Sequence, residues 1–201
     1  MKITLIDTGK RFNRDWIFRH LSYEFSTGHS YAITGPNGSG KSTLLQSIAG
    51  AIGVSEGRIG YDSIAPEHIY RHLSLAAPYL QLIEEMTVTE FLHFHAAFKP
   101  FLPGRSAAEI IRFVGLEPAA HKQIRYYSSG MKQRVRLAQA LFSDTPVVLL
   151  DEPCTNLDAD GIELYRRLIG EIAANRVVIV SSNDLQEYDF CEERIDIRDY
   201  R

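Results

Sequence analysis

The stretch of sequence that decides the fold is Gly35-Pro36-Asn37-Gly38-Ser39-Gly40-Lys41-Ser42. Its glycines allow backbone N–H groups to curl around phosphate oxygens, because a Cβ at those positions would collide with the anion. A helix that starts near Lys41 directs its positive end at the same anion. The Lys41 ammonium then faces the β- and γ-phosphates, and the Ser42 hydroxyl faces Mg²⁺. The stretch therefore predicts a phosphate-binding loop between a strand and a helix.

The sequence around this loop predicts an α/β core. Apolar runs at residues 30–34, 73–76, 147–150 and 177–180 are expected as strands, and residues 41–49 and 161–174 as helices. Unbroken apolar strands that alternate with helices indicate a parallel sheet covered on both faces. Residues 21–25 alternate between apolar and polar types, so antiparallel strands are expected at the N-terminal end.

The middle of the chain predicts a helical insertion. Thr87 and Glu90 have the spacing of a capping box, and so do Ser106 and Glu109, with Gly115 at the end of the second helix. Residues 80–142 are expected to be mostly helical. The fold class is thus α/β: a P-loop NTPase core with a mostly parallel sheet, an N-terminal antiparallel β subdomain and an inserted α-helical subdomain. We expect one domain over 1–201, with the core at 1–78 and 143–201 and the helical subdomain at 79–142.

Composition limits the partners and the cellular location expected for this chain. The formal net charge is −3, whereas a DNA-phosphate footprint is normally basic, so no nucleic-acid partner is expected. Cys154 and Cys191 form no C-x-x-C pattern and suggest a reducing compartment. No run approaches the ~20 apolar residues of a membrane span, and the N-terminus is too polar for a leader. A cytoplasmic location is expected.

A second part of the candidate site follows the apolar run 147–150. Asp151 stands at the carboxyl end of that strand, where α/β sheets place ligands, and its carboxylate can hold Mg²⁺ through water. Glu152 beside it can polarise an attacking water as a general base. The alternative is an ordinary strand end with two solvated acids. The phosphate loop favours the catalytic interpretation.

Small residues before a strongly helical stretch predict another helix N-terminus at Tyr127-Ser128-Ser129-Gly130-Met131. Together with the phosphate loop, the Asp151-Glu152 pair and Thr155-Asn156-Leu157-Asp158, this stretch makes the chain resemble the nucleotide-binding subunit of an ATP-binding cassette (ABC) transporter over nearly its whole length.

The resemblance implies a head-to-tail dimer, expected as a homodimer, that holds two ATP molecules between its subunits. Ser128 and Gly130 of one subunit would close on the γ-phosphate held by the other, and Asp158 would lie across the interface. Ser42 and Asp151 would serve Mg²⁺, and Glu152 would be the catalytic base. The loop residues implied to hold the nucleotide are Gly35, Pro36, Asn37, Gly38, Ser39, Gly40, Lys41, Ser42 and Thr43.

Two further roles concern adenine and the membrane. Phe12 or Trp16 would stack on the adenine ring, with Phe12 favoured and plain core packing as the alternative for either ring. The family couples dimer closure to a separate transmembrane permease subunit, which implies peripheral attachment to the cytoplasmic face of the membrane. Residues 79–86 are interpreted as the surface that meets that subunit, with core packing as the alternative.

Three positions depart from the family pattern. Ser129 replaces a glycine, which adds a Cβ near the phosphate. Tyr79 stands where the family has a metal-contacting glutamine, and Gln81, two residues on, is the candidate substitute. Asn183 stands in place of the switch histidine, and an amide cannot carry an imidazole's proton. The sequence therefore predicts ATP binding with slow hydrolysis.

The leading hypothesis is an ATPase subunit that powers a transporter. One alternative is a regulatory or scaffolding protein that binds ATP and dimerises with little turnover. Another is a soluble ABC ATPase of DNA repair, chromosome maintenance or translation. Those proteins usually carry coiled-coil insertions or tandem ATPase domains, and this sequence shows neither.

Overall fold

The computed structural model describes residues 1–62, 64–172 and 174–201. The chain divides into two compact units. The first unit, here called the core unit, comprises 1–75, 146–152 and 175–201. The second, the helical unit, comprises 76–145 and 153–174. The segment 153–174 thus groups with the helical unit, although the sequence suggested the core, because its helix packs on a helix of the insertion.

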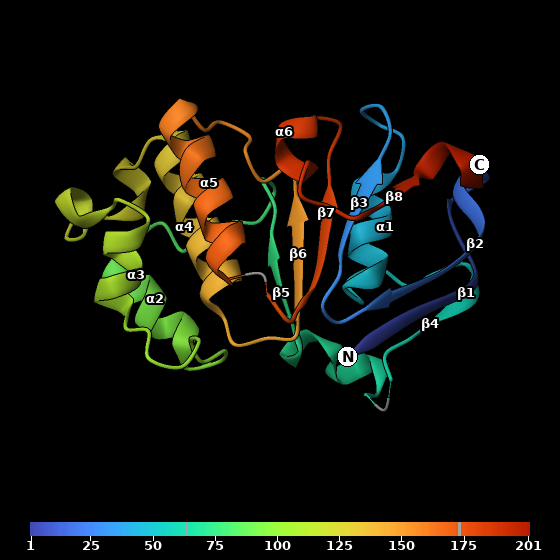
Figure 1. Ribbon diagram of the computed structural model, residues 1–201, viewed down its shortest axis with the longest axis horizontal. Coiled ribbons are helices and arrows are strands. Elements are labelled where there is room, and N and C mark those ends of the chain that lie inside the picture. The colour runs from blue at the N-terminus through green and yellow to red at the C-terminus, as the bar shows by residue number, and fades with distance from the viewer. Residues whose placement is uncertain (63, 173) are drawn as a thin grey trace. The chain divides into compact units, whose positions relative to one another are not determined.

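A five-stranded sheet runs through the core unit (Figure 1). Its strands, in the spatial order β5-β6-β7-β3-β8, are β5 (Leu73–Ala76), β6 (Val147–Asp151), β7 (Val177–Ser181), β3 (Ser30–Thr34) and β8 (Glu193–Asp196). The pairs β3–β7, β3–β8 and β6–β7 are parallel, which confirms the predicted parallel sheet. The register aligns Ser181 with Asp151 on one side and with Ile33 on the other. The carboxyl ends of three strands therefore meet at one edge.

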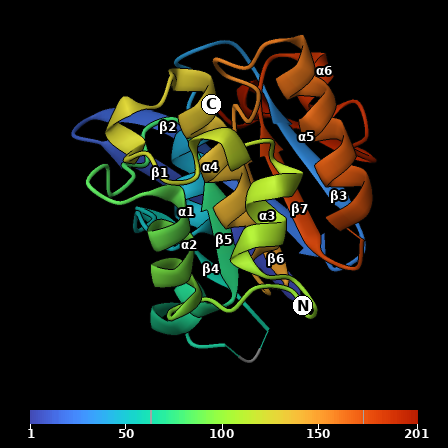
Figure 2. The same ribbon diagram turned by 90° about the vertical axis from the view of Figure 1, so that its left-hand side faces the viewer.

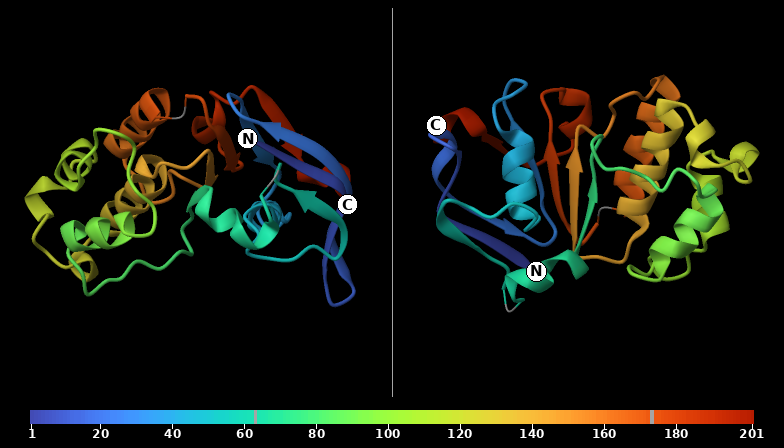
Figure 3. Two further views of the ribbon diagram at one scale, coloured as in Figure 1. Left: turned by 90° about the horizontal axis from the view of Figure 1, so that it is seen from below. Right: turned by 180° about the vertical axis from the view of Figure 1, so that it is seen from behind.

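Helix α1 (Lys41–Ile48) begins directly after the glycine-rich loop and covers one face of this sheet (Figure 3). Leu44, Leu45 and Ile48 are fully buried in the same core as Leu149 of β6 and Ile179 of β7. This packing orders the loop, because it fixes both the strand that enters it and the helix that leaves it. A short helix α6 (Leu185–Tyr188) and a 3₁₀ turn (Ile197–Tyr200) follow β7 and β8.

A three-stranded antiparallel sheet, in the order β2-β1-β4, makes up the rest of the core unit. Its strands are β1 (Lys2–Phe12), β2 (Asp15–Ser26) and β4 (Glu56–Gly60). The antiparallel arrangement was predicted, but β1 and β2 are far longer than residues 21–25. Bulges explain the difference: the register shifts between Leu5 and Thr8, and Asp7 and His20 have positive φ. Each bulge inverts the inward–outward alternation and hides the strand from its sequence pattern.

The helical unit contains α2 (Val88–Ala96), α3 (Ala107–Phe113), α4 (Ser129–Phe142) and α5 (Ala159–Ile172). Both predicted capping boxes are present, with Thr87 and Ser106 as the N-caps. Helix α4 contacts α2, α3 and α5 (Figure 2). Irregular segments separate α2, α3 and α4, so residues 80–142 are less helical than predicted. Pro100, Pro103 and Pro118 in those segments restrict helix formation.

Helix α5 starts at Ala159, two residues before the predicted start, because Asp158 Oδ1 accepts a hydrogen bond from Gly161 N at 2.9 Å. Residue 173, within the predicted helix 161–174, lies outside the described residues. None of the helices in residues 1–62, 64–172 and 174–201 has both the length and the apolar character that crossing a bilayer requires.

Candidate functional site

The glycine-rich loop forms a pocket of about 220 Å³ in the core unit. The pocket combines the loop, the first turn of α1, one residue of β2 and the end of β6. Its lining residues are Ile17, Asn37, Gly38, Gly40, Lys41, Ser42, Thr43 and Glu152. The structure thus brings Glu152 to the predicted phosphate loop. It also adds Ile17 of β2, which no pattern in the sequence singled out.

Gly40 shows why this loop requires glycine. It caps the N-terminus of α1 with φ +105°, and a Cβ there would lie 2.2 Å from Ile17 Cγ2. Only glycine combines that conformation with that close approach. Within the described residues no side chain caps α1, so the first N–H groups of the helix are available to an anion.

Lys41 carries the positive charge of the pocket. Its side chain folds back over the loop, where Nζ donates hydrogen bonds to Gly35 O at 2.9 Å and Pro36 O at 3.3 Å. The residue is only 5% exposed. Both of these hydrogen bonds go to neutral carbonyl groups, and the Lys41 charge also opposes the rise that burial causes in the pKa of Asp151. A phosphate oxygen at this position would give the ammonium an anionic hydrogen-bond partner.

Asp151 lies at the carboxyl end of β6 and is nearly fully buried. Burial raises the pKa of its carboxyl group, and a hydrogen bond with the Ser42 side chain opposes that rise. Among the described residues, Asp151 Oδ1 and the hydroxyl of Ser39 are buried without a hydrogen-bond partner. Buried polar atoms of this kind are normally satisfied, so this arrangement fits a bound cation and nucleotide.

Glu152 has φ +44°, an uncommon conformation for a residue with a side chain. Its N–H donates to Ser181 O at 2.9 Å, which ties the end of β6 to the end of β7. Asn183 follows two residues after Ser181 and is exposed. Between them, Ser182 N donates to Ile33 O at 3.1 Å. The end of β6 at Glu152 is therefore bonded to the end of β7, and the residue before Asn183 is bonded to β3, the strand that leads into the phosphate loop.

The two candidate adenine-stacking rings have different surroundings. Guanidinium groups of Arg19 and Arg11 lie 4.5 and 5.4 Å from the Trp16 ring centroid. Phe12, at the end of β1, is 46% exposed with the Lys10 ammonium 4.9 Å from its ring. Phe12 has more open ring surface for a purine, because two cations already occupy the surroundings of Trp16.

A second pocket, of about 340 Å³, lies in the helical unit at the start of α4. It unites the predicted Ser128 and Gly130 with the predicted Asp158; its lining residues are Ser128, Ser129, Gly130, Met131, Arg134, Asn156, Leu157 and Asp158. Ser128 is the N-cap of α4 and accepts from Met131 N at 3.2 Å. Arg134 Nη2 lies 3.4 Å from Asp158 Oδ1.

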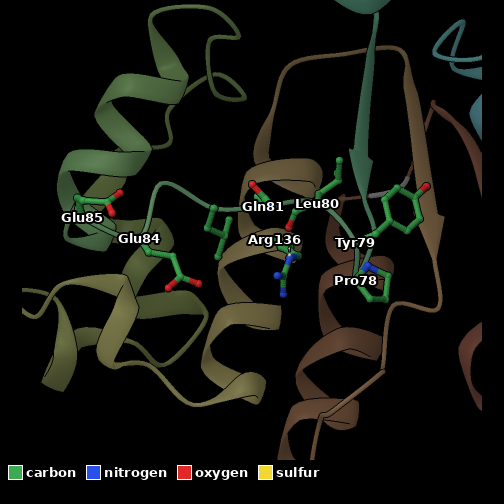
Figure 4. A pocket seen from close by; sticks show the side chains of 8 residues that line it. Pro78, Tyr79, Leu80, Gln81, Glu84, Glu85 and Arg136 are labelled. Atoms are coloured by element: carbon green, nitrogen blue, oxygen red, sulfur yellow. Dashed lines mark hydrogen bonds between the residues drawn. The ribbon is translucent and has the colours of Figure 1, made fainter.

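A third pocket, of about 430 Å³, is also confined to the helical unit (Figure 4). It is lined by Pro78, Tyr79, Leu80, Gln81, Leu82, Glu84, Glu85 and Arg136. The exposed Gln81 lines it together with Tyr79 (Figure 4). Leu82 is 8% exposed and packs inward, whereas Ile83 is 37% exposed. The segment therefore serves the core with Leu82 and presents a surface with its neighbours.

The family profile that matches this chain and two of its relatives are all described as ABC transporter or ATP-binding proteins. The family profile "ABC transporter" matches residues 18–155. A "Cytochrome c biogenesis ATP-binding export protein CcmA" of Agrobacterium fabrum is 35% identical over 84% of this chain and 82% of its own length. A "Lipoprotein-releasing system ATP-binding protein LolD 2" of Rhodospirillum rubrum is 33% identical over 92% of this chain and 87% of its own length.

Solved structures show the same fold. A putative ABC transporter ATP-binding protein from Pyrococcus furiosus superposes with a TM-score of 0.85 at 20% identity, covering 100% of this chain and 99% of that one. A bacterial ABC transporter cassette, described as a dimeric structure, superposes with a TM-score of 0.81 at 24% identity, covering 97% of this chain and 94% of that one.

Proposed function

The chain belongs to the ABC transporter family as an ATP-binding, ATP-hydrolysing subunit, and we propose that it works as a head-to-tail dimer that drives a separate transmembrane permease. The observation that carries the proposal is the presence of two different pockets at helix N-termini. One holds the phosphate loop with Glu152, and the other holds Ser128 and Gly130. In a head-to-tail pair, each pocket of one chain would meet the complementary pocket of the other.

The phosphate loop binds the nucleotide in this proposal. Backbone N–H groups at the start of α1 hold the β- and γ-phosphates, and Lys41 exchanges its bonds to Gly35 O and Pro36 O for phosphate oxygens. Phe12 stacks on adenine and Ile17 packs beside the ribose. The residues assigned to nucleotide contact are Phe12, Ile17, Gly35, Pro36, Asn37, Gly38, Ser39, Gly40, Lys41, Ser42 and Thr43.

Ser42 and Asp151 would hold Mg²⁺, and the unpartnered Asp151 Oδ1 supports this assignment. The ion supplies positive charge against the β- and γ-phosphates when bound. Glu152 accepts a proton from the attacking water. Asn183 donates an amide hydrogen bond to the γ-phosphate. Gln81 is the candidate for the family's metal-contacting glutamine, because Tyr79 stands at that position of the sequence.

The partner subunit completes the site. Ser128 and Gly130 from the other chain close on the γ-phosphate, and Asp158 lies at the dimer interface. Loss of the γ-phosphate removes the bridge between the chains and lets them separate. The pocket formed by residues 78–85 receives the permease, and the exposed Ile83 and Tyr79 offer it apolar contacts. The ATPase therefore attaches to the membrane through that partner.

A regulatory ATP-binding role is the second candidate, favoured by Ser129, Tyr79 and Asn183. One experiment separates it from the transporter ATPase and also tests the dimer. Substitution Glu152→Gln should lower kcat by about 10²–10⁴-fold, because it removes the general base, and should trap a dimer in Mg·ATP. Phosphate release and light scattering measure the two effects.

The matched control is Glu163→Gln, an exposed acid on α5 in the other unit, which should leave both readouts unchanged. A Glu152→Gln protein that stays monomeric in saturating Mg·ATP contradicts the shared-site mechanism. A wild-type protein with no more phosphate release than Glu152→Gln contradicts the ATPase and favours the regulatory role.

A further inference from the structure

Gln133 is a buried polar side chain to which neither the sequence nor the family resemblance assigned a role. It lies on α4 and is 1% exposed. Its Nε2 donates a hydrogen bond of 2.8 Å to Pro153 O. Pro153 follows Glu152 directly in the chain. A buried amide of this kind fixes the backbone it bonds, because breaking the bond would leave both polar groups unsatisfied.

Arg136 lies three residues further along α4, on the same side of the helix. Its Nε donates to Leu80 O at 2.9 Å, and its Nη1 lies 3.5 Å from Gln133 Oε1. One planar guanidinium, seen beside Leu80 in Figure 4, therefore reaches a backbone carbonyl of the 78–85 pocket. The same group also reaches the amide of Gln133 that holds Pro153. The two side chains form a continuous polar path from Leu80 O to Pro153 O.

Other contacts make α4 a rigid support for this path. Lys132 Nζ pairs with Glu84 Oε1 at 2.6 Å, on the same pocket segment as Leu80. Gly130 approaches the loop after Pro153 so closely that a Cβ would lie 2.9 Å from Asn156 O. The pocket segment and the loop 153–158 are therefore each bonded or packed to α4 at more than one point. The segment is also held by residues outside α4, since Arg125 N donates to Glu84 O at 3.0 Å, so α4 is one of the supports that a shift of the pocket segment would move.

We propose that Arg136 and Gln133 are positioning residues that transmit the state of the 78–85 pocket to the backbone at Pro153 and so set the placement of the adjoining Glu152 carboxylate. Neither residue contacts the nucleotide; each acts through Pro153. The inference rests on the proposed function, because it names the means by which an occupant of the pocket regulates hydrolysis. An occupant of the pocket would displace Leu80, whose carbonyl oxygen accepts the hydrogen bond from Arg136. The displacement would pass through Arg136 and Gln133 to Pro153 and so change the rate of ATP hydrolysis.

The kinetic test is a double-mutant cycle on the full chain with Arg136→Ala, Gln133→Ala and the double variant. Each single variant should lower kcat for ATP about tenfold, with KM changed by less than about twofold, because displacement of a catalytic group by a fraction of an ångström has effects of this size. The double variant should be no slower than the slower single, because both break one path. Losses that multiply, or a KM that rises with kcat unchanged, overturn the proposal.

Hydrogen exchange supplies a readout that needs no turnover. Arg136→Ala should speed exchange in residues 154–158 as well as in 79–85, whereas Arg112→Ala, which breaks an exposed ion pair with Glu117 in the same unit, should change neither. Faster exchange confined to 79–85 overturns the path. Arg136→Lys keeps the charge without the fork, is expected to change both segments in the same direction, and replaces Arg136→Ala if that variant does not fold.

The two assays keep the hypotheses apart. Absence of phosphate release by the wild type contradicts the proposed function. The hydrogen-exchange result then tests by itself whether Arg136 and Gln133 connect the pocket to Pro153. Normal phosphate release by the wild type, with faster hydrogen exchange in 79–85 alone for Arg136→Ala, contradicts the path and leaves the proposed ATPase function unaffected.

Discussion

The pocket at the phosphate loop and the pocket at the start of α4 both lie at a helix N-terminus, but their helices begin differently. Gly40 caps α1 without a side chain, whereas Ser128 caps α4 with its own hydroxyl on Met131 N. The first helix thus leaves its N–H groups to a ligand, and the second has satisfied one of them internally. The comparison teaches that the start of α1 has one more unpaired N–H group to offer an anion than a start capped as α4 is.

Charge separates the two pockets further. Lys41 Nζ donates its hydrogen bonds to the carbonyl oxygens of Gly35 and Pro36, while Arg134 is paired with Asp158. The Lys41 ammonium therefore has neutral hydrogen-bond partners that a phosphate can replace, whereas the Arg134 guanidinium already faces a carboxylate. We expect the first pocket to bind nucleotide by itself and the second to contribute only when a γ-phosphate is delivered to it by a partner chain.

The largest effect is expected from Lys41→Ala, which removes the cation that distinguishes the first pocket. Loss of a charge-assisted hydrogen bond to phosphate costs about 3 kcal/mol, which corresponds to roughly hundredfold weaker binding. Titration with a fluorescent ATP analogue measures it. Lys2→Ala, which removes an exposed ion pair with Glu24, is the control and should bind normally. Wild-type affinity of Lys41→Ala for the ATP analogue would contradict the claim that the Lys41 charge makes the first pocket the nucleotide-binding one.

Gly130→Ala tests the second pocket. The new Cβ would lie 2.9 Å from Asn156 O and force the backbone there to move. We expect kcat to fall about tenfold while monomer affinity for ATP stays within about twofold. Gly170→Ala on α5, where a Cβ meets nothing within 4 Å, is the matched control and should hydrolyse ATP at the wild-type rate. Weaker ATP binding by the Gly130→Ala monomer would contradict this assignment, because it would mean that the second pocket contributes to ATP binding before the dimer closes.

Asn183→His sharpens the comparison at the edge of the first pocket. An imidazole can exchange a proton near neutral pH, which an amide cannot, so kcat should rise severalfold, up to about tenfold. Phosphate release at saturating ATP measures the change, and Asn183→Ala should not exceed the wild type. A histidine variant that is no faster would remove Asn183 as the cause of slow turnover.

The smallest effect concerns acid stability and is specific to the helical unit. Burial lowers the pKa of His95 to about 4, and its Nε2 lies 2.8 Å from Ser143 Oγ. The folded state therefore holds a neutral ring, while the unfolded chain binds the proton below its ordinary pKa of 6.5. This contribution is fully present above pH 6.5 and is lost as the pH falls from 6.5 toward 4.

Urea unfolding between pH 7 and pH 5 checks this expectation. Allowing for partial solvent screening, wild-type stability should fall by about 1 kcal/mol over that interval from this group. His95→Gln should flatten the dependence, and His121→Gln, at an exposed position, should not. An unchanged slope in His95→Gln would assign the acid sensitivity to another group.

Local features were predictable, and features made by distant residues were not. The capping boxes at Thr87 and Ser106 need only four consecutive residues, and the phosphate loop needs only eight. Ile17 reaches the phosphate loop from β2, so no spacing in the sequence could select it. Bulges near Asp7 concealed β1 because they reverse the alternation on which strand prediction depends.

The sequence by itself determined the parallel sheet, the phosphate loop and the family, because these depend on contiguous patterns of apolar residues, glycines and charges. Only the tertiary structure decided that Trp16 is flanked by two cations, Arg11 and Arg19, while the exposed Phe12 has Lys10 over its ring. It also decided that Gln133 and Arg136 join Pro153 to Leu80. The physical reason is that hydrogen bonds and ring contacts depend on distance in space, and folding brings residues together whose separation in sequence carries no pattern.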